Sequence, residues 1–282
     1  MNSIESLIAA SHENFDLTSQ SDQERLMKLT ERLLASQVGV QALKKVAKQT
    51  PLEFRLAVML AESRTILQGI DQPVSIGIVF AMWGEHNRLK PRSDESPHGE
   101  DSLRTKLSQL DWITRGTGVD WHLYAVDDGD PMHSSDIARD MIRDHPLKHR
   151  VTVLHLADAL PAKDGPLHGL KTPDDSRKGG AIIHGSMQAI SDGVDAVIYT
   201  DADNSVHLGQ IGLLLGPFIG QQVRVVLGTR KHEDAVLVKQ EARWGIGIKL
   251  LRHMQRMVGS PIFSRGIKDT QAAFKLYQAG VL

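Results

Sequence analysis

Two acidic clusters in this chain of 282 residues have the residue types and spacing to do metal and phosphate chemistry. Asp127-Asp128-Gly129-Asp130 follows one apolar run, and Asp201-Ala202-Asp203 follows another. Carboxylates directly after a strand suit Mg²⁺ or Mn²⁺, because hard cations prefer oxygen ligands and keep positions open for phosphate oxygens. Either cluster alone is equally well interpreted as an ordinary turn. The presence of both favours a site for a divalent ion and a diphosphate.

A basic, glycine-rich turn is the third candidate. Arg177-Lys178-Gly179-Gly180-Ala181 opens a predicted helix over residues 181–190. The free N–H groups of a helix N-terminus and the charge of Lys178 would attract an anion. For this turn alone, a loop with solvated charges is the favoured interpretation. The polar stretch 157–177 before it is predicted to be a loop, either a flap over the ligand or decoration.

Other polar and aromatic candidates have plainer interpretations. The chain has no cysteine, so a metal would need oxygen or imidazole ligands. His207 follows Asp203 closely and could approach a metal, but a loop or helix-cap residue is the favoured interpretation. Trp83 and Trp244 could stack on a base or a sugar, whereas packing in the core or at a rim is favoured.

The elements that must position these residues begin at residue 74, where short apolar runs start to alternate with helical stretches. The predicted strands are residues 74–80, 121–126, 151–156, 196–200 and 223–228. Strands alternating with helices predict an α/β fold with a mainly parallel sheet flanked by helices. In such sheets ligands bind beyond the carboxyl ends of the strands, which is where both acidic clusters would lie.

The segment before residue 70 reads as helices with no strand between them. We predict an N-terminal helical extension at residues 1–70 and an α/β domain at residues 71–282. The apolar stripes of these helices could pack on the α/β domain, contact a partner or lie on a membrane, and packing within the protein is the favoured interpretation. No chemistry is assigned to this region.

Composition limits the classes of partner. Lysine and arginine (33) nearly balance aspartate and glutamate (34), which leaves no overall field to recruit nucleic acid or an anionic membrane. The N-terminus lacks the basic start and apolar run of a signal peptide, and no stretch reaches the ~18–20 apolar residues of a membrane span. We therefore expect a cytoplasmic protein without a nucleic-acid partner, for which peripheral membrane contact and a homo-oligomer stay open.

The order of the motifs resembles the family 2 glycosyltransferases with the GT-A fold. The resemblance covers about residues 74–278 and rests on short motifs that recur in order. In addition to the two acidic clusters and the basic turn, these motifs are Glu85-His86-Asn87-Arg88-Leu89, Leu227-Gly228-Thr229-Arg230 and Lys268-Asp269-Thr270-Gln271-Ala272-Ala273-Phe274-Lys275-Leu276. The last two look like the branch that includes dolichyl-phosphate and other polyprenyl-phosphate sugar transferases.

The resemblance implies a GT-A Rossmann-like domain that binds a nucleotide sugar. Asp201 and Asp203 match the DxD motif, in which the second aspartate usually binds the divalent ion and the first contacts sugar or ribose. The further donor and substrate contacts that it implies are Glu85, Asp127, Asp128, Lys178 and Gln271. Arg230 matches an arginine near the donor or acceptor phosphate.

The implied reaction is displacement at the anomeric carbon of a UDP- or GDP-sugar, with inversion and loss of a nucleoside diphosphate. An acceptor such as a polyprenyl phosphate would need little help from a base. A hydroxyl acceptor would need one, and Asp269 is the candidate, unless that residue caps a helix. The candidate catalytic residues are thus Asp201, Arg230 and Asp269, with Asp203 and Asp201 as ligands of Mg²⁺ or Mn²⁺.

The sequence departs from the family at several positions. Of the turn that normally follows the first strand only Glu85 remains, and Ala273 stands where the family has a glycine. Relatives continue past the position of Leu282, so we expect part of the acceptor side to be truncated. Two alternatives stay open, a sugar nucleotidyltransferase and a non-catalytic protein that binds nucleotide sugars.

Overall fold

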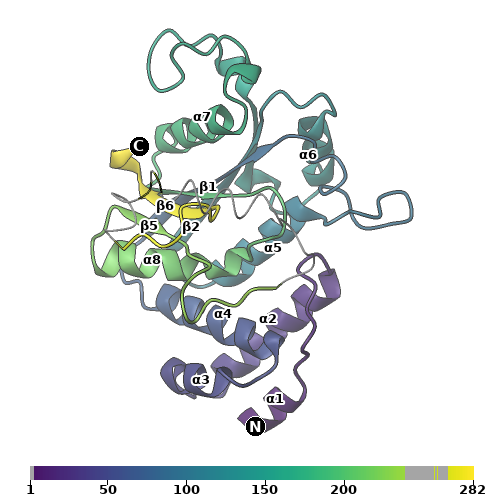
Figure 1. Ribbon diagram of the computed structural model, residues 1–282, viewed down its shortest axis with the longest axis vertical. Helices are drawn as coiled ribbons and strands as arrows, with labels where there is room; N and C mark the ends of the chain where they lie inside the picture. The colour runs from purple at the N-terminus through teal and green to yellow at the C-terminus, as the bar shows by residue number, and fades with distance from the viewer. Residues whose placement is uncertain (1–2, 239–256, 258, 260–265) are drawn as a thin grey trace.

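A central sheet organises the protein, for which the computed structural model describes residues 3–238, 257, 259 and 266–282 (Figure 1). Within these residues six strands lie in the order β3-β2-β1-β4-β6-β5. The strands are β1 (Val74–Met82), β2 (Val119–Asp127), β3 (Val151–His155), β4 (Ala196–Thr200), β5 (Val225–Leu227) and β6 (Phe274–Gln278). Neighbours among β1 to β4 pair in parallel, whereas β6 is antiparallel to both β4 and β5. The predicted Rossmann-like α/β fold, with a mainly parallel sheet flanked by helices, is confirmed.

Helices cover both faces of this sheet. They are α5 (Ser102–Thr114), α6 (Ser134–Ile142), α7 (Lys178–Ser191) and α8 (Ile211–Gly220), with short 3-10 turns η1 (Lys148–Arg150), η2 (Leu156–Ala159), η3 (Pro173–Asp175), η4 (Leu208–Gln210) and η5 (Ala279–Val281). Ile78 and Phe80 of β1 share a core with α5, α6 and α8, whereas Val79 and Ala81 share another with α7. Because β1 is buried on both faces, it reads as one apolar run rather than an alternating one.

The strand order creates a switch point between β1 and β4. The chain moves from β1 through β2 to β3 in one direction, and α7 then carries it back across the sheet to β4. Right-handed crossovers in opposite directions place their helices on opposite faces, which explains why α7 lies on the other face of the sheet from α5, α6 and α8. The carboxyl ends of β1 and β4 therefore border a crevice of the kind in which open α/β sheets bind ligands.

All five predicted strands exist, four of them with shifted ends and β4 with the predicted ones. The run at 121–126 extends to Val119–Asp127, and the run at 223–228 shortens to Val225–Leu227. The sixth strand, β6, was not predicted as a strand. It is short and antiparallel, and only its first and third residues are buried, so it lacks the continuous apolar run by which the other strands were identified.

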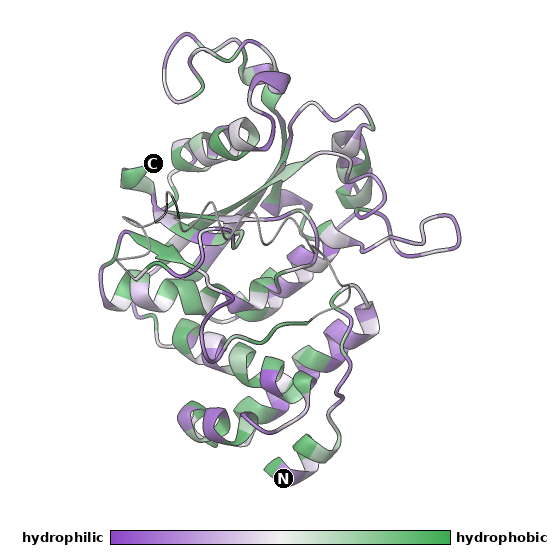
Figure 2. Cartoon of the chain, in the orientation of Figure 1, coloured by the Kyte–Doolittle hydropathy of each residue, from purple (hydrophilic) through white to green (hydrophobic). Residues whose placement is uncertain are grey.

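The N-terminal helices pack against the rest of the protein, as the sequence favoured. They are α1 (Ile4–Ala9), α2 (Gln20–Ala35), α3 (Val40–Ala47) and α4 (Leu52–Gln68), and Figure 2 shows apolar and polar residues along each of the longer ones. Leu33 and Phe54 belong to a core that α1 to α4 share. Leu67, at the other end of α4, belongs to the core under the sheet. The division at residue 70 stays a prediction, because α4 takes part in both cores.

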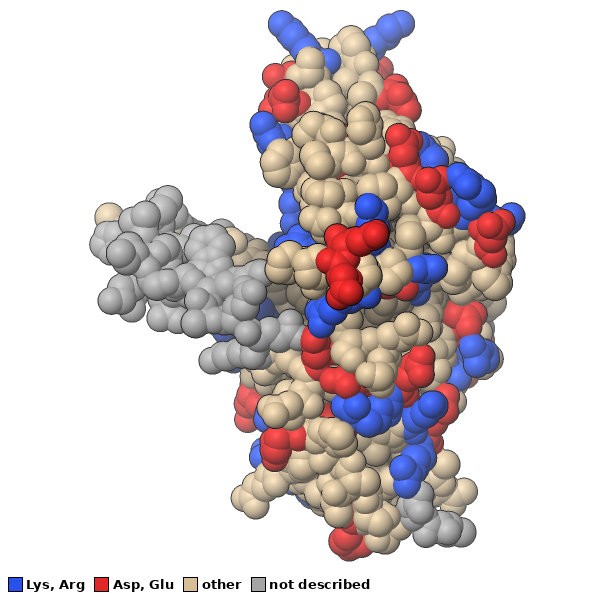
Figure 3. All heavy atoms as spheres, turned by 90° about the vertical axis from the view of Figure 1, so that its right-hand side faces the viewer, with Lys and Arg blue, Asp and Glu red and all other residues tan. Residues whose placement is uncertain are grey.

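Surface charge is mixed on the face that Figure 3 shows. Acidic and basic residues alternate over its described part, in keeping with the balanced composition. Within the described ranges, every helix is too short or too polar to traverse a lipid bilayer.

Candidate functional site

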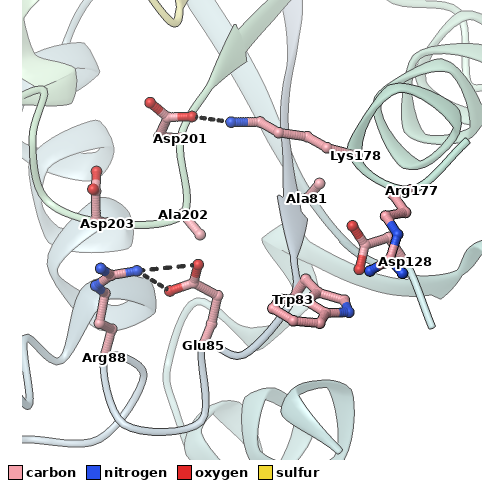
Figure 4. Close-up of a pocket in the computed structure, with 10 residues that line it drawn as sticks. All are labelled: Ala81, Trp83, Glu85, Arg88, Asp128, Arg177, Lys178, Asp201, Ala202 and Asp203. Carbon is pink, nitrogen blue, oxygen red and sulfur yellow. Dashed lines mark hydrogen bonds and ion pairs between the residues drawn. The ribbon is translucent and has the colours of Figure 1, made fainter. Parts of the chain in front are cut away.

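A pocket of about 430 Å³ lies at the carboxyl ends of β1 and β4 (Figure 4). Its lining combines the ends of these two strands with the starts of α7 and of the turn after β2. The lining residues are Ala81, Trp83, Glu85, Arg88, Asp128, Arg177, Lys178, Asp201, Ala202 and Asp203. The sequence predicted functional roles for Glu85, Asp128, Lys178, Asp201 and Asp203, and the fold brings all of these residues to one pocket.

The pair of aspartates directly after β4 forms one wall. The Lys178 ammonium donates to Asp201 Oδ1 at 2.5 Å, so the first aspartate is ion-paired across the pocket (Figure 4). Asp203 Oδ1 accepts from the backbone N–H of Ser205 at 3.1 Å. Burial opposes ionisation of Asp203, but hydrogen bonds from Ser205 and the charges of Lys106 and Arg88 prevail and lower its pKa. Asp203 therefore stays a carboxylate near neutral pH.

A buried lysine under this wall was not predicted. Lys106 of α5 is 1% exposed, and its ammonium donates to the backbone carbonyl of Asp203. Burial lowers the pKa of Lys106 to about 8, against the opposing charges of Asp203, Glu100 and Asp201. The sequence does hold a signal for it, because Lys106 lies three residues after Leu103 and next to Leu107 on the apolar stripe of its helix.

An arginine between two glutamates lies next to Asp203 (Figure 4). Arg88 Nη1 donates to Glu85 Oε2 at 3.0 Å, and Arg88 Nε lies 3.4 Å from Glu100 Oε1. Glu100 also accepts from the backbone N–H of Asn204 at 2.8 Å, which ties this side to the loop after Asp203. Burial raises the pKa of both glutamates even though Arg88 opposes the shift.

The acidic cluster after β2 divides its roles. Asp127 Oδ1 accepts from the backbone N–H groups of Gly129 and Asp130, each at 2.9 Å, so this carboxylate shapes the turn and does not line the pocket. Asp130 accepts from Ser134 at the start of α6. Asp128 does line the pocket, is 3% exposed, and its Oδ1 has no hydrogen-bond partner among the described residues. Burial and the charges of Asp127 and Asp130 raise the pKa of Asp128 to about 6.

A tryptophan and an arginine meet beside Asp128. The Arg177 guanidinium carbon lies 5.6 Å from the centre of the Trp83 ring, and both residues line the pocket (Figure 4). Trp83 is 51% exposed, so it is a rim residue rather than a core one, while Trp244 lies outside the described residues. Arg177 has a φ of 53°, a left-handed conformation that costs energy for a residue with a side chain. This bend turns the loop before it into the start of α7.

The predicted catalytic residues Arg230 and Asp269 form a pair outside the pocket lining. Arg230 Nε and Nη2 donate to the two oxygens of Asp269 at 2.8 and 2.9 Å, and the backbone N–H of Gln271 donates to Asp269 Oδ1 at 3.0 Å. The hydrogen bonds from Arg230 hold the pKa of Asp269 far below its usual range. The hydrogen bonds to Asp269 and, as the smallest contribution, the charge of Asp201 raise the pKa of Arg230.

The alternative in which Asp269 caps a helix is wrong, because the next element is β6. The helix-cap interpretation of His207 is confirmed. His207 Nδ1 accepts from the backbone N–H of Gly209 at 2.9 Å at the start of η4, and burial lowers its pKa to about 3. Of the predicted site residues, Asp127, Arg230, Asp269 and Gln271 thus lie outside the pocket lining, and their roles stay predictions.

Metal binding here would depend on a substrate. In the described part of the chain no group of three or more histidine, aspartate or glutamate side chains is arranged to hold an ion. Mg²⁺ and similar ions are commonly held by one or two carboxylates, with substrate phosphates and water as the other ligands. The pair Asp201 and Asp203 fits such a site, because both line a pocket open to a phosphate.

Among known proteins, the chain has a distant structural neighbour but matches no family model. No protein-family model matches the chain, and no curated protein matches it in sequence. Among solved structures, the mannosyltransferase PcManGT from Pyrobaculum calidifontis, in complex with GDP-Man and Mn²⁺, is similar over 70% of this chain and 46% of that chain. The sequence identity is 11% and the TM-score 0.30, and the match spans about half of the mannosyltransferase. A likeness this distant does not extend to function.

Proposed function

We propose that the protein is a metal-dependent glycosyltransferase that moves a sugar from a UDP- or GDP-sugar to an acceptor such as a polyprenyl phosphate, with inversion. The observation that carries this proposal is the pocket at the sheet's switch point, in which carboxylates that follow β4 lie with basic side chains from the start of α7. Nucleotides bind at this position in open α/β sheets.

The charge of the pocket supports a diphosphate ligand accompanied by a divalent ion. Four carboxylates (Glu85, Asp128, Asp201, Asp203) and three cations (Arg88, Arg177, Lys178) line it, which gives a formal charge of −1 when all are ionised. One divalent ion would reverse that charge to +1 and make the pocket attractive to a diphosphate. Asp201 and Asp203 would hold the ion, which when bound stabilises the negative charge on the departing diphosphate.

The remaining lining residues have roles that suit a nucleotide sugar. The unpartnered Oδ1 of Asp128 is a buried acceptor, and we assign it to an N–H of the base or a hydroxyl of the ribose. The exposed Trp83 ring offers a face for stacking of the base. Lys178 lies at the first position of α7, where its charge adds to the backbone N–H groups of the helix N-terminus.

The pair Arg230 and Asp269 supports an acceptor that is already anionic. Asp269 accepts two side-chain hydrogen bonds from Arg230, and its very low pKa makes it a weak base. A hydroxyl acceptor would need a stronger base than this, whereas a phosphate acceptor needs none. We therefore propose that Asp269 orients Arg230 toward the acceptor phosphate rather than removing a proton.

A binding panel followed by a transfer assay tests the proposal. We expect UDP- or GDP-sugars to raise the melting temperature in the presence of Mn²⁺ and less without it. Asp203→Ala should lose this metal-dependent rise and lower kcat/KM by about 100-fold or more, because it removes a metal ligand. Asp144→Ala, at an exposed position, is the matched control and should leave both unchanged.

Two outcomes would contradict the proposal. If nucleotide sugars fail to stabilise the protein while nucleoside triphosphates succeed, the sugar nucleotidyltransferase alternative replaces it. If nucleotide sugars bind but neither the wild type nor Asp144→Ala turns them over, with acceptor phosphates or with water, the protein is a nucleotide-sugar-binding protein without transferase activity.

A further inference from the structure

The first of the two proposed metal ligands already holds a cation. Lys178 Nζ lies 2.5 Å from Asp201 Oδ1, the carboxylate oxygen that faces the pocket in Figure 4. Among the ion pairs of the described residues, this is the one that involves the carboxylate of Asp201 or Asp203. Lys106 also approaches this wall, but it donates to the backbone carbonyl of Asp203 and leaves the carboxylate free of that contact.

We propose that Lys178 is a placeholder for the divalent ion: its ammonium balances Asp201 in the ion-free protein, and moves to the diphosphate when the ion and the nucleotide bind. This inference rests on the proposed function and adds a second role for Lys178 to the one given above. It predicts that metal and nucleotide bind cooperatively. The ion replaces Lys178 as the partner of Asp201, and the diphosphate becomes the new partner of Lys178, so that neither charge is left unpaired.

The side chain has the freedom that this exchange needs. Lys178 is the first residue of α7, so its backbone is fixed by the helix, while its side chain is 55% exposed on a flexible four-carbon stem. The helix itself is held close to the sheet, since a Cβ on Gly185 would lie 2.6 Å from Val79 Cγ1. The exchange therefore involves rotation of one side chain over a fixed helix end and requires no movement of the fold.

Electrostatic repulsion prevents the Lys178 ammonium and the divalent ion from binding Asp201 at the same time. An ammonium and a divalent ion sharing one carboxylate would lie within a few ångströms of each other, where like charges repel by several kcal/mol at an effective dielectric constant of about 20. A lysine ammonium is a compact point charge that binds phosphate well, so the diphosphate offers it an alternative partner. Without a diphosphate, Lys178 competes with the ion and weakens its binding.

The experiment measures Mn²⁺ binding to the full chain by titration calorimetry, first alone and then with UDP or GDP present. For Lys178→Met we expect Mn²⁺ alone to bind about three- to tenfold more tightly than to the wild type, since a partly exposed ion pair no longer competes. UDP or GDP with Mn²⁺ should bind that variant about three- to tenfold more weakly. Lys178→Arg keeps the cation and should retain the weak binding of Mn²⁺ alone.

The control is Lys163→Met, at an exposed loop position, which should change neither affinity. Melting temperatures of the variants without ligands show that each is folded. If Mn²⁺ binds the wild type with UDP or GDP, but Lys178→Met leaves the affinity for Mn²⁺ alone unchanged or weaker, the placeholder role is wrong and the proposed function stands. If Mn²⁺ fails to bind the wild type with UDP and also with GDP, both the proposed function and the placeholder role are wrong.

Discussion

At the scale of single residues, Asp128 links the site to pH. In the folded protein its pKa is raised from 3.8 to about 6, so the folded state resists ionisation that the unfolded chain undergoes freely. The free energy of unfolding should therefore fall as the pH rises from about 4 through 6, because the unfolded state then binds fewer protons than the folded one. Asp128→Asn has no charge to bury and escapes this loss.

We expect the melting temperature of Asp128→Asn minus that of the wild type to be larger at pH 7.5 than at pH 4.5, by about 2–4 °C or more, without ligands. Differential scanning calorimetry across this range measures it. Asp144→Asn, which is exposed, should give a difference that does not vary with pH. A flat difference for Asp128→Asn would show that its carboxylate is not buried as described.

Which single residues could be predicted depends on whether a motif marks them. Asp201 and Asp203 follow an apolar run, and strand ends meet at one sheet edge, so their convergence with Glu85 and Lys178 was predictable. The choice between Asp127 and Asp128 was not, because it depends on which carboxylate the turn's N–H groups take. Lys106 belongs to no motif, and its contact with the carbonyl of Asp203 depends on how α5 packs against the sheet.

At the scale of elements, the contact between α4 and α8 is closer than side chains allow. A Cβ added to Gly212 of α8 would lie 2.2 Å from the backbone oxygen of Ser63 in α4, and the N–H of Gly212 donates to Ser63 Oγ at 2.9 Å. A backbone atom cannot move aside as a flexible side chain can. The two helices must therefore separate to admit even a methyl group.

We expect Gly212→Ala to lower the free energy of unfolding by about 1–3 kcal/mol or more, through overpacking. Thermal or urea unfolding measures it. Gly220→Ala, in the same helix but with nothing within 4 Å of the added Cβ, is the matched control and should be neutral or slightly stabilising, since alanine favours helix. Equal effects for the two substitutions would contradict the close contact.

The elements themselves were mostly predictable, for a physical reason. β1, β2 and β4 are mostly buried strands in the parallel part of the sheet and read as apolar runs between helices, as does the half-buried β3. β6 could not be predicted in this way, because only part of it is buried and it pairs with strands that lie far from it in the chain. The pairing of Arg230 with Asp269 depends on the contact between β5 and β6, since Arg230 follows β5 in the chain and Asp269 precedes β6.

At the scale of the whole molecule, the N-terminal helices and the sheet share buried contacts. α4 places Phe54 in the N-terminal core and Leu67 in the sheet core. Gln109 of α5 donates to Gln23 of α2 at 3.1 Å and accepts from the backbone N–H of Leu208 at 2.8 Å, all buried. A buried polar bridge of this kind leaves unpaired groups if the two parts separate.

This sharing predicts that residues 1–70 and 71–282 unfold together, as one cooperative transition rather than as two domains. Leu33 is fully buried in the N-terminal core, and Leu33→Ala should lower the free energy of unfolding by about 2–5 kcal/mol. The whole protein, including the sheet, should then unfold in one transition at a lower temperature. Val38→Ala, 37% exposed in the same region, should cost at most about 0.5 kcal/mol. Differential scanning calorimetry distinguishes one transition from two. Mn²⁺ and a nucleotide sugar are added because they should raise the melting temperature of the part of the protein that holds the pocket. If Leu33→Ala moved one transition and the ligand another, the N-terminal helices would be an independent unit and α4 would not couple them to the site.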